Sequence, residues 1–245
     1  MALHFLLDTA TDAHPGDTLV LTGAEAHHAA AVRRVRVGEE VTVGDGRGVR
    51  LTGAVASVAP KEVRVEVGER VVTPAPTPRT VLVQALAKGD RDELAVQAAT
   101  ELGVDEIVPW QAARSVSRWD AAKAAKGVAR WETIAREAAK QAHRSWLAVV
   151  SDPSSTRQLA ARSERCRMLV LEPTASVSLT EVALDAADTR DVVLVVGPEG
   201  GIAPDELATL EQAGATLVRL GDTVLRTSTA GPVALALVNA ALGRW

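Results

Sequence analysis

The sequence is poor in several residue types that mark common classes of protein. Its 245 residues include one cysteine, Cys166, so no internal disulfide and no cysteine-based zinc site can form. Aromatic residues are almost absent, with five Trp, one Phe and no Tyr, which argues against a sheet that stacks RNA bases on exposed rings. No apolar run has the length of a membrane span, and the first residues lack the basic start of a secretory signal. We therefore expect a cytoplasmic protein without a metal.

The residues that are present describe a globular protein with an uneven charge distribution. Hydrophobic residues make up 47% of the chain and the net charge is −4, which excludes disorder and leaves room for two domains. The segment Arg114–Arg144, however, carries eight Lys and Arg against three acids. A shorter basic cluster, Arg33, Arg34 and Arg36, follows His28. Either these are solvated helix faces, or they form a surface that binds a polyanion.

Two regions with different hydrophobic periodicity meet at 73–79, where three prolines in seven residues predict a stiff linker. Before it, short strand-like runs and one helix predict a small β-barrel. After it, buried strand runs alternate with helices and predict a parallel sheet covered on both faces. The clearest expected strands are 62–67, 81–86, 106–110, 168–171, 192–196 and 216–220. The expected helices are 25–35, 90–102, about 121–144, about 179–186, 204–213 and a last one through 233–242.

The strongest local feature is a glycine-rich loop after the strand 192–196. Gly197–Gly201 contains three glycines, and Pro204 then opens a helix. The carboxyl ends of parallel strands are where α/β proteins place ligands, and glycine lets the backbone approach them closely. The loop is neither a P-loop nor a dinucleotide fingerprint, and Glu199 would repel phosphate, so a neutral or cationic ligand is favoured. On this interpretation Gly200→Val should abolish ligand binding. The alternative is a tight turn without a ligand.

A second loop of this kind follows the strand 216–220. Leu220-Gly221 leads into a hydroxyl-rich stretch with one arginine, Arg226, before the last helix. Thr227, Ser228 and Thr229 could simply cap that helix. Two such loops would nevertheless lie side by side at the same edge of the sheet.

Together these motifs resemble the SPOUT superfamily of knotted methyltransferases, and within it the family of 16S rRNA uridine-N3 methyltransferases. The resemblance covers nearly the whole chain. It rests on the motifs of the two loops (GPEGG, LG and VLRT) and on these further residues: His28, Val32, Arg34, Gly38, Asp45-Gly46, Lys88-Gly89, Glu93, Gln97, Glu101–Val104, Arg114–Val116, Arg130-Trp131, Glu137-Ala138, Gln141 and Arg144.

The resemblance implies an α/β SPOUT-type domain at 80–245, with a mostly parallel sheet and a C-terminal trefoil knot, after a PUA-like, RNA-binding β-barrel at 1–72. It also implies S-adenosyl-L-methionine as cofactor, a homodimer, and 16S rRNA or the small ribosomal subunit as substrate. The expected cofactor-binding residues are Leu171, Glu172, Val196, Gly197, Pro198, Glu199, Gly200, Gly201, Leu220, Gly221, Leu225, Arg226 and Thr229. Arg226 and Glu199 are the expected catalytic residues. The expected RNA-binding residues are His28, Arg33, Arg34, Arg36, Arg114, Arg130 and Arg144.

Several positions depart from the family pattern. Ala203 stands in place of a serine before Pro204, and Ser228 stands in place of a glutamate inside the expected site. The second change bears on any mechanism in which that glutamate transfers a proton. Two alternatives therefore stay open: a catalytically silent RNA- or ribosome-binding protein with the same fold, and an unrelated α/β enzyme that binds a nucleotide at the glycine-rich loop.

Overall fold

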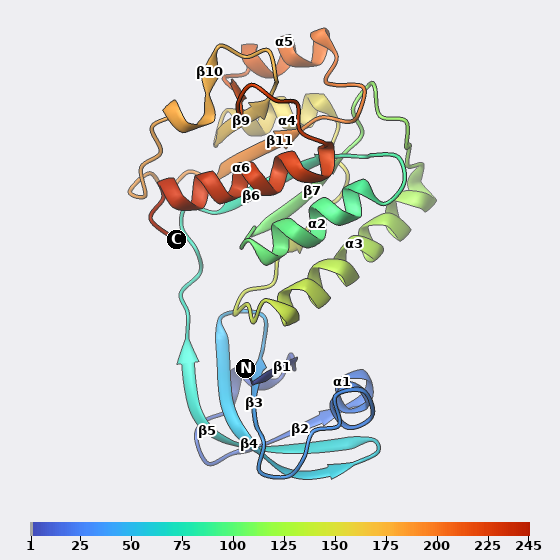
Figure 1. The fold of residues 1–245 in the computed structure, drawn as a ribbon, viewed down its shortest axis with the longest axis vertical. Coiled ribbons are helices and arrows are strands. Elements are labelled where there is room, and N and C mark those ends of the chain that lie inside the picture. The colour runs from blue at the N-terminus through green and yellow to red at the C-terminus, as the bar shows by residue number, and fades with distance from the viewer. Residues whose placement is uncertain (1) are drawn as a thin grey trace. The chain divides into compact units, whose positions relative to one another are not determined.

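The computed structural model describes residues 2–245, which form two compact units (Figure 1). The first unit comprises the chain up to Ala75 together with residues 139–147, and the second comprises Pro76–Ala138 and Ala148–Trp245. Each unit has apolar cores of its own, one in the first and two in the second. Among the described residues, no helix combines the length and the apolar character needed to cross a membrane.

The first unit is built on a five-stranded mixed sheet in the order β1-β3-β4-β5-β2. The strands are β1 (Leu3–Leu6), β2 (Thr18–Thr22), β3 (Glu40–Gly44), β4 (Val49–Ala59) and β5 (Glu62–Val72). In β5 every second side chain is buried at its start, as the alternation of valine with charged residues predicts. The expected helix 25–35 is split into α1 (Gly23–His27) and a wider helical turn η2 (His28–Arg33), and it ends at Arg34, which takes a left-handed conformation with φ 55°.

Residues 139–147 return to this unit from a helix that begins in the other one. The backbone N–H of Gly48 donates to the carbonyl of Ser145 at 2.9 Å, and that of Leu147 donates to Gly46 at 2.9 Å. Lys140 is buried here at 6% exposure, with its Nζ 2.8 Å from the Glu25 carboxylate. The charges of Arg114–Arg144 therefore do not form one continuous solvated surface.

The second unit contains a seven-stranded sheet in the order β10-β12-β9-β11-β6-β7-β8, and every pair in it is parallel. This confirms the expected parallel sheet. The strands are β6 (Thr80–Ala85), β7 (Glu106–Trp110), β8 (Val149–Val150), β9 (Arg167–Leu171), β10 (Val177–Ser178), β11 (Val192–Val196) and β12 (Thr216–Arg219). All residues of β6, β7 and β11 are buried, because helices cover both faces of the sheet.

Two layers of helices sandwich this sheet (Figure 1). One core joins the sheet to α2 (Arg91–Glu101), α3 (Ala121–Gln141) and α6 (Thr227–Ala241). The other joins it to α4 (Thr156–Ser163) and α5 (Pro204–Gln212). The expected helix 179–186 is wrong: only a short 3-10 turn, η3 (Leu179–Glu181), forms there. Asp185 accepts a hydrogen bond from the backbone N–H of Ala187 at 2.8 Å, which favours a turn over a helix.

Candidate functional site

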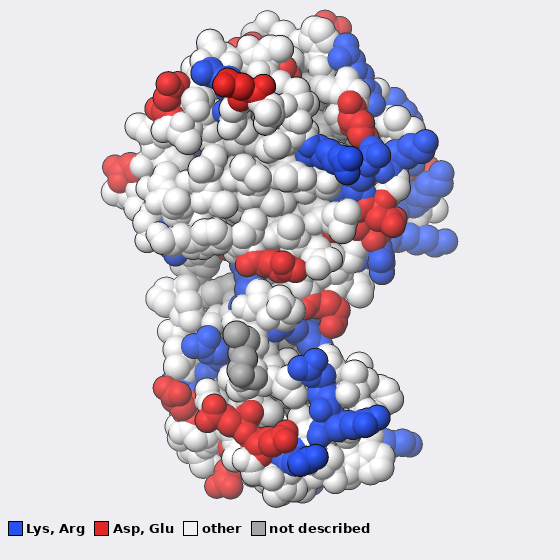
Figure 2. Space-filling model, in the orientation of Figure 1, with Lys and Arg blue, Asp and Glu red and all other residues white. Residues whose placement is uncertain are grey.

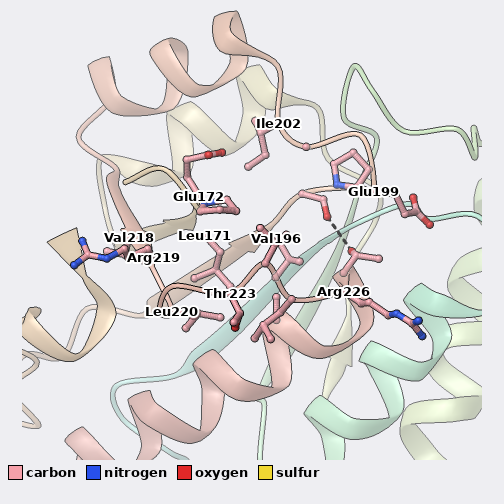
Figure 3. Close-up of a pocket in the computed structure, with 18 of the residues that line it drawn as sticks. Leu171, Glu172, Val196, Glu199, Ile202, Val218, Arg219, Leu220, Thr223 and Arg226 are labelled. Atoms are coloured by element: carbon pink, nitrogen blue, oxygen red, sulfur yellow. Dashed lines mark hydrogen bonds between the residues drawn. The ribbon is translucent and has the colours of Figure 1, made fainter. Parts of the chain in front are cut away.

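A pocket opens where three neighbouring strands, β12, β9 and β11, end at the same edge of the sheet (Figure 3). Its volume is about 360 Å³, within the range of small-molecule sites. The chain leaves β11 toward β12 on one side of the sheet, whereas it leaves the neighbouring strand β6 toward β7 on the other side. Such switch points are where open α/β sheets bind ligands. Its lining comes from the loops after these strands and from the start of α2 and α6: Arg91, Leu171, Glu172, Pro173, Val196, Gly197, Pro198, Glu199, Gly201, Ile202, Val218, Arg219, Leu220, Gly221, Thr223, Val224, Leu225, Arg226, Thr227 and Ala230.

The glycine-rich loop forms one wall, and its glycines have different roles. A Cβ at Gly197 would lie 2.6 Å from Cγ1 of Ile202, a buried wall residue, so only glycine fits there without displacing it. Gly201 has φ 71°, a left-handed conformation that favours glycine. Gly200 does not line the pocket, and a Cβ there would meet Arg114 at an ordinary 3.4 Å. A side chain at Gly200 would therefore face Arg114, and this geometry gives no support to the expectation that Gly200→Val blocks the ligand.

A buried hydroxyl fixes this loop to the sheet and to the last helix. Thr227 Oγ1 donates to the carbonyl of Gly197 at 2.9 Å and accepts from Gln84 Nε2 at 2.9 Å. Gln84 lies in β6 and is fully buried, and Thr227 is 7% exposed. Thr227 thus does more than the capping expected of it, because it links three segments at the floor of the pocket.

Glu199 is held at the rim by the segment that leads into α2. Its Oε1 accepts hydrogen bonds from Arg91 Nη1 at 2.8 Å and from the backbone N–H of Lys88 at 3.1 Å. Partial burial by itself raises the pKa of Glu199, but hydrogen bonds from backbone N–H groups and from Arg91 outweigh it and hold the pKa below its usual range. The hydrogen bonds from Arg91 and Lys88 both go to Oε1, which leaves Oε2 available to a cationic ligand group.

The opposite wall, residues 220–226, combines apolar side chains with unused hydrogen-bonding groups. None of the backbone N–H groups of 221–225 donates to another described residue. Leu171, Val196 and Leu220 supply apolar surface beside them (Figure 3). Arg226 is exposed and has no ion-pair partner in the described part of the chain, and it pairs with neither Asp222 nor Glu199. An apolar slot with free amides suits a flat heterocycle whose edge needs directional hydrogen bonds.

The structure gathers the expected cofactor residues at this pocket, except that Gly200 and Thr229 lie outside its lining. Ser228 lies in the first turn of α6, half-buried. Reasoning from sequence missed Arg91, Ile202 and Thr223. Arg91 precedes the pocket loops by about a hundred residues in the chain, and no local pattern connects it to Glu199.

The expected RNA-binding residues are distributed over both units. In the first unit, Arg33, Arg34 and Arg36 are exposed, and Arg144 is half-buried. His28 is half-buried against the ring of Phe5, and its Nδ1 lies 3.4 Å from Lys140 Nζ, so it contributes to packing.

In the second unit, Lys and Arg gather over α3 and the loop before it (Figure 2). Two expected RNA contacts there already have protein partners. Arg114 Nη1 donates to the carbonyl of Gly200 at 3.2 Å and supports the glycine-rich loop from outside. Arg130 forms an ion pair with Glu93 at 2.9 Å, while 59% of its side chain stays exposed.

Comparison with known proteins identifies the family. A family model described as an RNA methyltransferase domain matches residues 73–239, and one described as an RNA methyltransferase PUA domain matches residues 21–68. A ribosomal RNA small subunit methyltransferase E from Mycobacterium bovis is 45% identical, and the match covers 100% of this chain and 94% of that protein. The protein of that name from Bacillus subtilis is 31% identical, with 98% and 96% covered. The chain belongs to the ribosomal RNA small subunit methyltransferase E family.

A solved structure agrees with this assignment. The crystal structure of a ribosomal RNA small subunit methyltransferase E from Neisseria gonorrhoeae, bound to S-adenosyl methionine, superposes with a TM-score of 0.85. The two chains are 28% identical, and the match covers 98% of each. The family resemblance, the enzyme class and the PUA unit expected from the sequence are thus confirmed. The comparisons support an rRNA methyltransferase over the two alternatives, a silent RNA-binding protein and an unrelated nucleotide-binding enzyme.

Proposed function

We propose that the protein transfers a methyl group from S-adenosyl-L-methionine to N3 of a uridine in 16S rRNA. The observation that carries this proposal is the pocket at the ends of β12, β9 and β11, in a chain whose relatives are rRNA methyltransferases. S-adenosyl-L-methionine would supply an electrophilic methyl on its sulfonium. The apolar walls and the free amides of 221–225 suit its adenosyl part, and Glu199 Oε2 suits its amino group.

The acceptor atom sets what the protein must add. Uracil N3 carries a proton and lies on the Watson–Crick edge, so the base must be unpaired. The N3 proton would pass to solvent, the N–CH₃ bond would form as the S–CH₃ bond of the cofactor breaks, and S-adenosylhomocysteine would be the leaving group. Arg226, which is exposed at the rim without an ion-pair partner among the described residues, is suited to stabilise the negative charge on the uracil oxygens. The lowered pKa of Glu199 makes it a weak base, so we assign it to the cofactor and not to proton transfer.

The same proposal includes the finer points of architecture. We place an RNA-binding domain at 1–72, the linker at 73–79 and the methyltransferase domain at 80–245. A trefoil knot at the C-terminus is supported by the strand order, in which the late strand β11 inserts between β9 and β6 and the last strand β12 inserts between β10 and β9. A homodimer through α6 is supported by apolar side chains on two faces of this helix. Leu235 and Val238 are buried in the core, whereas Val233 is 37% exposed and Leu237 is only partly buried. We place the enzyme in the cytoplasm.

Calorimetry with S-adenosyl-L-methionine and with ATP tests the cofactor. The proposal predicts saturable binding of the first and none of the second. Binding of ATP alone would contradict it. Light scattering at micromolar concentration tests the dimer, which a particle of 25.7 kDa would exclude.

A further inference from the structure

A hollow distinct from the cofactor pocket lies beside it in the second unit. The segment between them is shared: Arg91 lines the cofactor pocket, whereas Lys88 and Asp92 line the hollow. The volume of the hollow is about 410 Å³. Its lining comes from the loop before α2, the first turn of α2, the loop before α3, and α3 itself: Ala87, Lys88, Gly89, Asp92, Glu93, Val116, Ser117, Trp119, Gly127, Arg130 and Trp131. We refer to these residues as the Trp119 hollow.

The Trp119 hollow explains motif residues whose side chains do not line the cofactor pocket. Lys88-Gly89, Glu93, Val116 and Arg130-Trp131 come from two blocks of the chain that carry the family resemblance, and none of them lines the cofactor pocket. Packing alone accounts for Trp131, which is 1% exposed. It does not account for Lys88 and Arg130, which are exposed, or for Val116 at 69% exposure.

The indole of Trp119 packs over a glycine of α3 that lowers the stability of this helix. Gly127 lies inside α3, where glycine disfavours the helix by about 1 kcal/mol relative to alanine. A Cβ at this position would lie 2.5 Å from Cη2 of Trp119, so glycine makes room for the ring. The ring of Trp119 also packs edge-on against Trp131, with centroids 5.4 Å apart. Trp119 is half-buried and lines the hollow.

The charges of the hollow balance. Lys88 and Arg130 are cations, and Asp92 and Glu93 are carboxylates, with Arg130 paired to Glu93. Both oxygens of Asp92 are occupied by backbone N–H groups, those of Ala87 at 3.1 Å and Glu93 at 2.9 Å. A phosphate gains little from such a surface, whereas a flat, neutral, polar ring can stack on an indole and bond to the polar rim.

We propose that the Trp119 hollow receives an unpaired base of the RNA substrate. This inference rests on the proposed function, because it supplies that methyltransferase with a subsite for its substrate next to the cofactor. The base could be the uracil that is methylated or a neighbour of it. Both have the same stacking chemistry, and the experiment below separates them.

The first test measures RNA affinity by titration of the full-length enzyme with an unpaired 16S rRNA fragment. Loss of one stacked base weakens RNA binding by about 5- to 150-fold, so Trp119→Leu should do the same. Gly127→Ala should also weaken binding, since its Cβ displaces the indole, while better helix propensity keeps α3 folded. Trp245→Leu is the matched control: Trp245 is 66% exposed and outside both cavities. It should leave RNA affinity unchanged.

Calorimetry with S-adenosyl-L-methionine keeps the two claims apart. Both Trp119 hollow variants should bind it as the wild type does, which also shows that their second unit is folded. RNA affinity of both variants equal to that of the wild type would overturn the subsite. A wild-type enzyme that binds no S-adenosyl-L-methionine would instead contradict the proposed function.

The second test uses RNA fragments that each lack one base. Removal of the stacked base should weaken binding to the wild type and cause no further loss in Trp119→Leu, because the two changes delete the same interaction. If the coupled position is the methylated nucleotide, the hollow holds the target uracil; if it is an adjacent nucleotide, the hollow holds a neighbour. If no position couples to Trp119, the proposal is wrong.

Discussion

The buried hydroxyl of Thr227 provides a sharp test of how the pocket is held together. Thr227→Val keeps nearly the same shape but removes two hydrogen bonds of 2.9 Å each. It strands one N–H of Gln84, which is fully buried, and the carbonyl of Gly197, a half-buried residue of the pocket lining. Leaving a buried polar group unsatisfied costs about 1–3 kcal/mol, so we expect the free energy of unfolding of the second unit to fall by about 1–3 kcal/mol.

Urea unfolding followed by tryptophan fluorescence measures this change, and calorimetry measures the affinity for S-adenosyl-L-methionine. That affinity should also fall, because the glycine-rich loop loses its anchor. Thr229→Val is the matched control: Thr229 is in the same helical turn but exposed, and its side chain bonds to no described residue. It should change stability by less than about 0.5 kcal/mol. Equal stabilities of Thr227→Val and Thr229→Val would refute the reasoning.

Three further predictions follow from the structure. Gly197→Ala should weaken S-adenosyl-L-methionine binding in calorimetry, because its Cβ displaces Ile202, whereas Gly68→Ala, whose Cβ would have ordinary contacts, should not. Burial alone raises the pKa of Glu106, but Arg162, Ser151 and Arg79 lower it from 4.5 to about 2. The lowered pKa contributes roughly 3 kcal/mol to the free energy of unfolding above pH 4.5, and this contribution should be lost as the pH falls toward 2. Acid unfolding of Glu106→Gln should lack this loss. If Arg34 contacts one RNA phosphate, Arg34→Asn should lower the slope of log K for RNA against log salt concentration by about 0.7. Asparagine tolerates the left-handed backbone at this position. Equal slopes for the variant and the wild type would exclude the phosphate contact.

Sequence reasoning succeeded where the signal is local. The apolar run 192–196 predicts a strand buried on both faces, and the glycines after it predict the loop that lines the pocket. Proline at the first position of α5 marks the start of that helix. The same kind of signal was available for α4, which was missed: Ser155 and Gln158 form a capping box.

Reasoning failed where contacts join residues far apart in the chain. Lys140 is one of many charges in a basic segment, yet its partner is Glu25, and both lie in the first unit. Thr227 suggests a helix cap, but its partners are Gln84 and Gly197. A pattern that spans a few residues carries no information on such pairs, because they depend on how the chain returns on itself.

The central claim is that this enzyme methylates N3 of a uridine in 16S rRNA. The most direct measurement maps modified uridines in 16S rRNA from cells with and without the gene, and then treats the unmodified rRNA with purified protein and S-adenosyl-L-methionine. The proposal predicts that one 3-methyluridine is lost without the gene and is restored by the wild-type protein. An identical map in the two strains would contradict it.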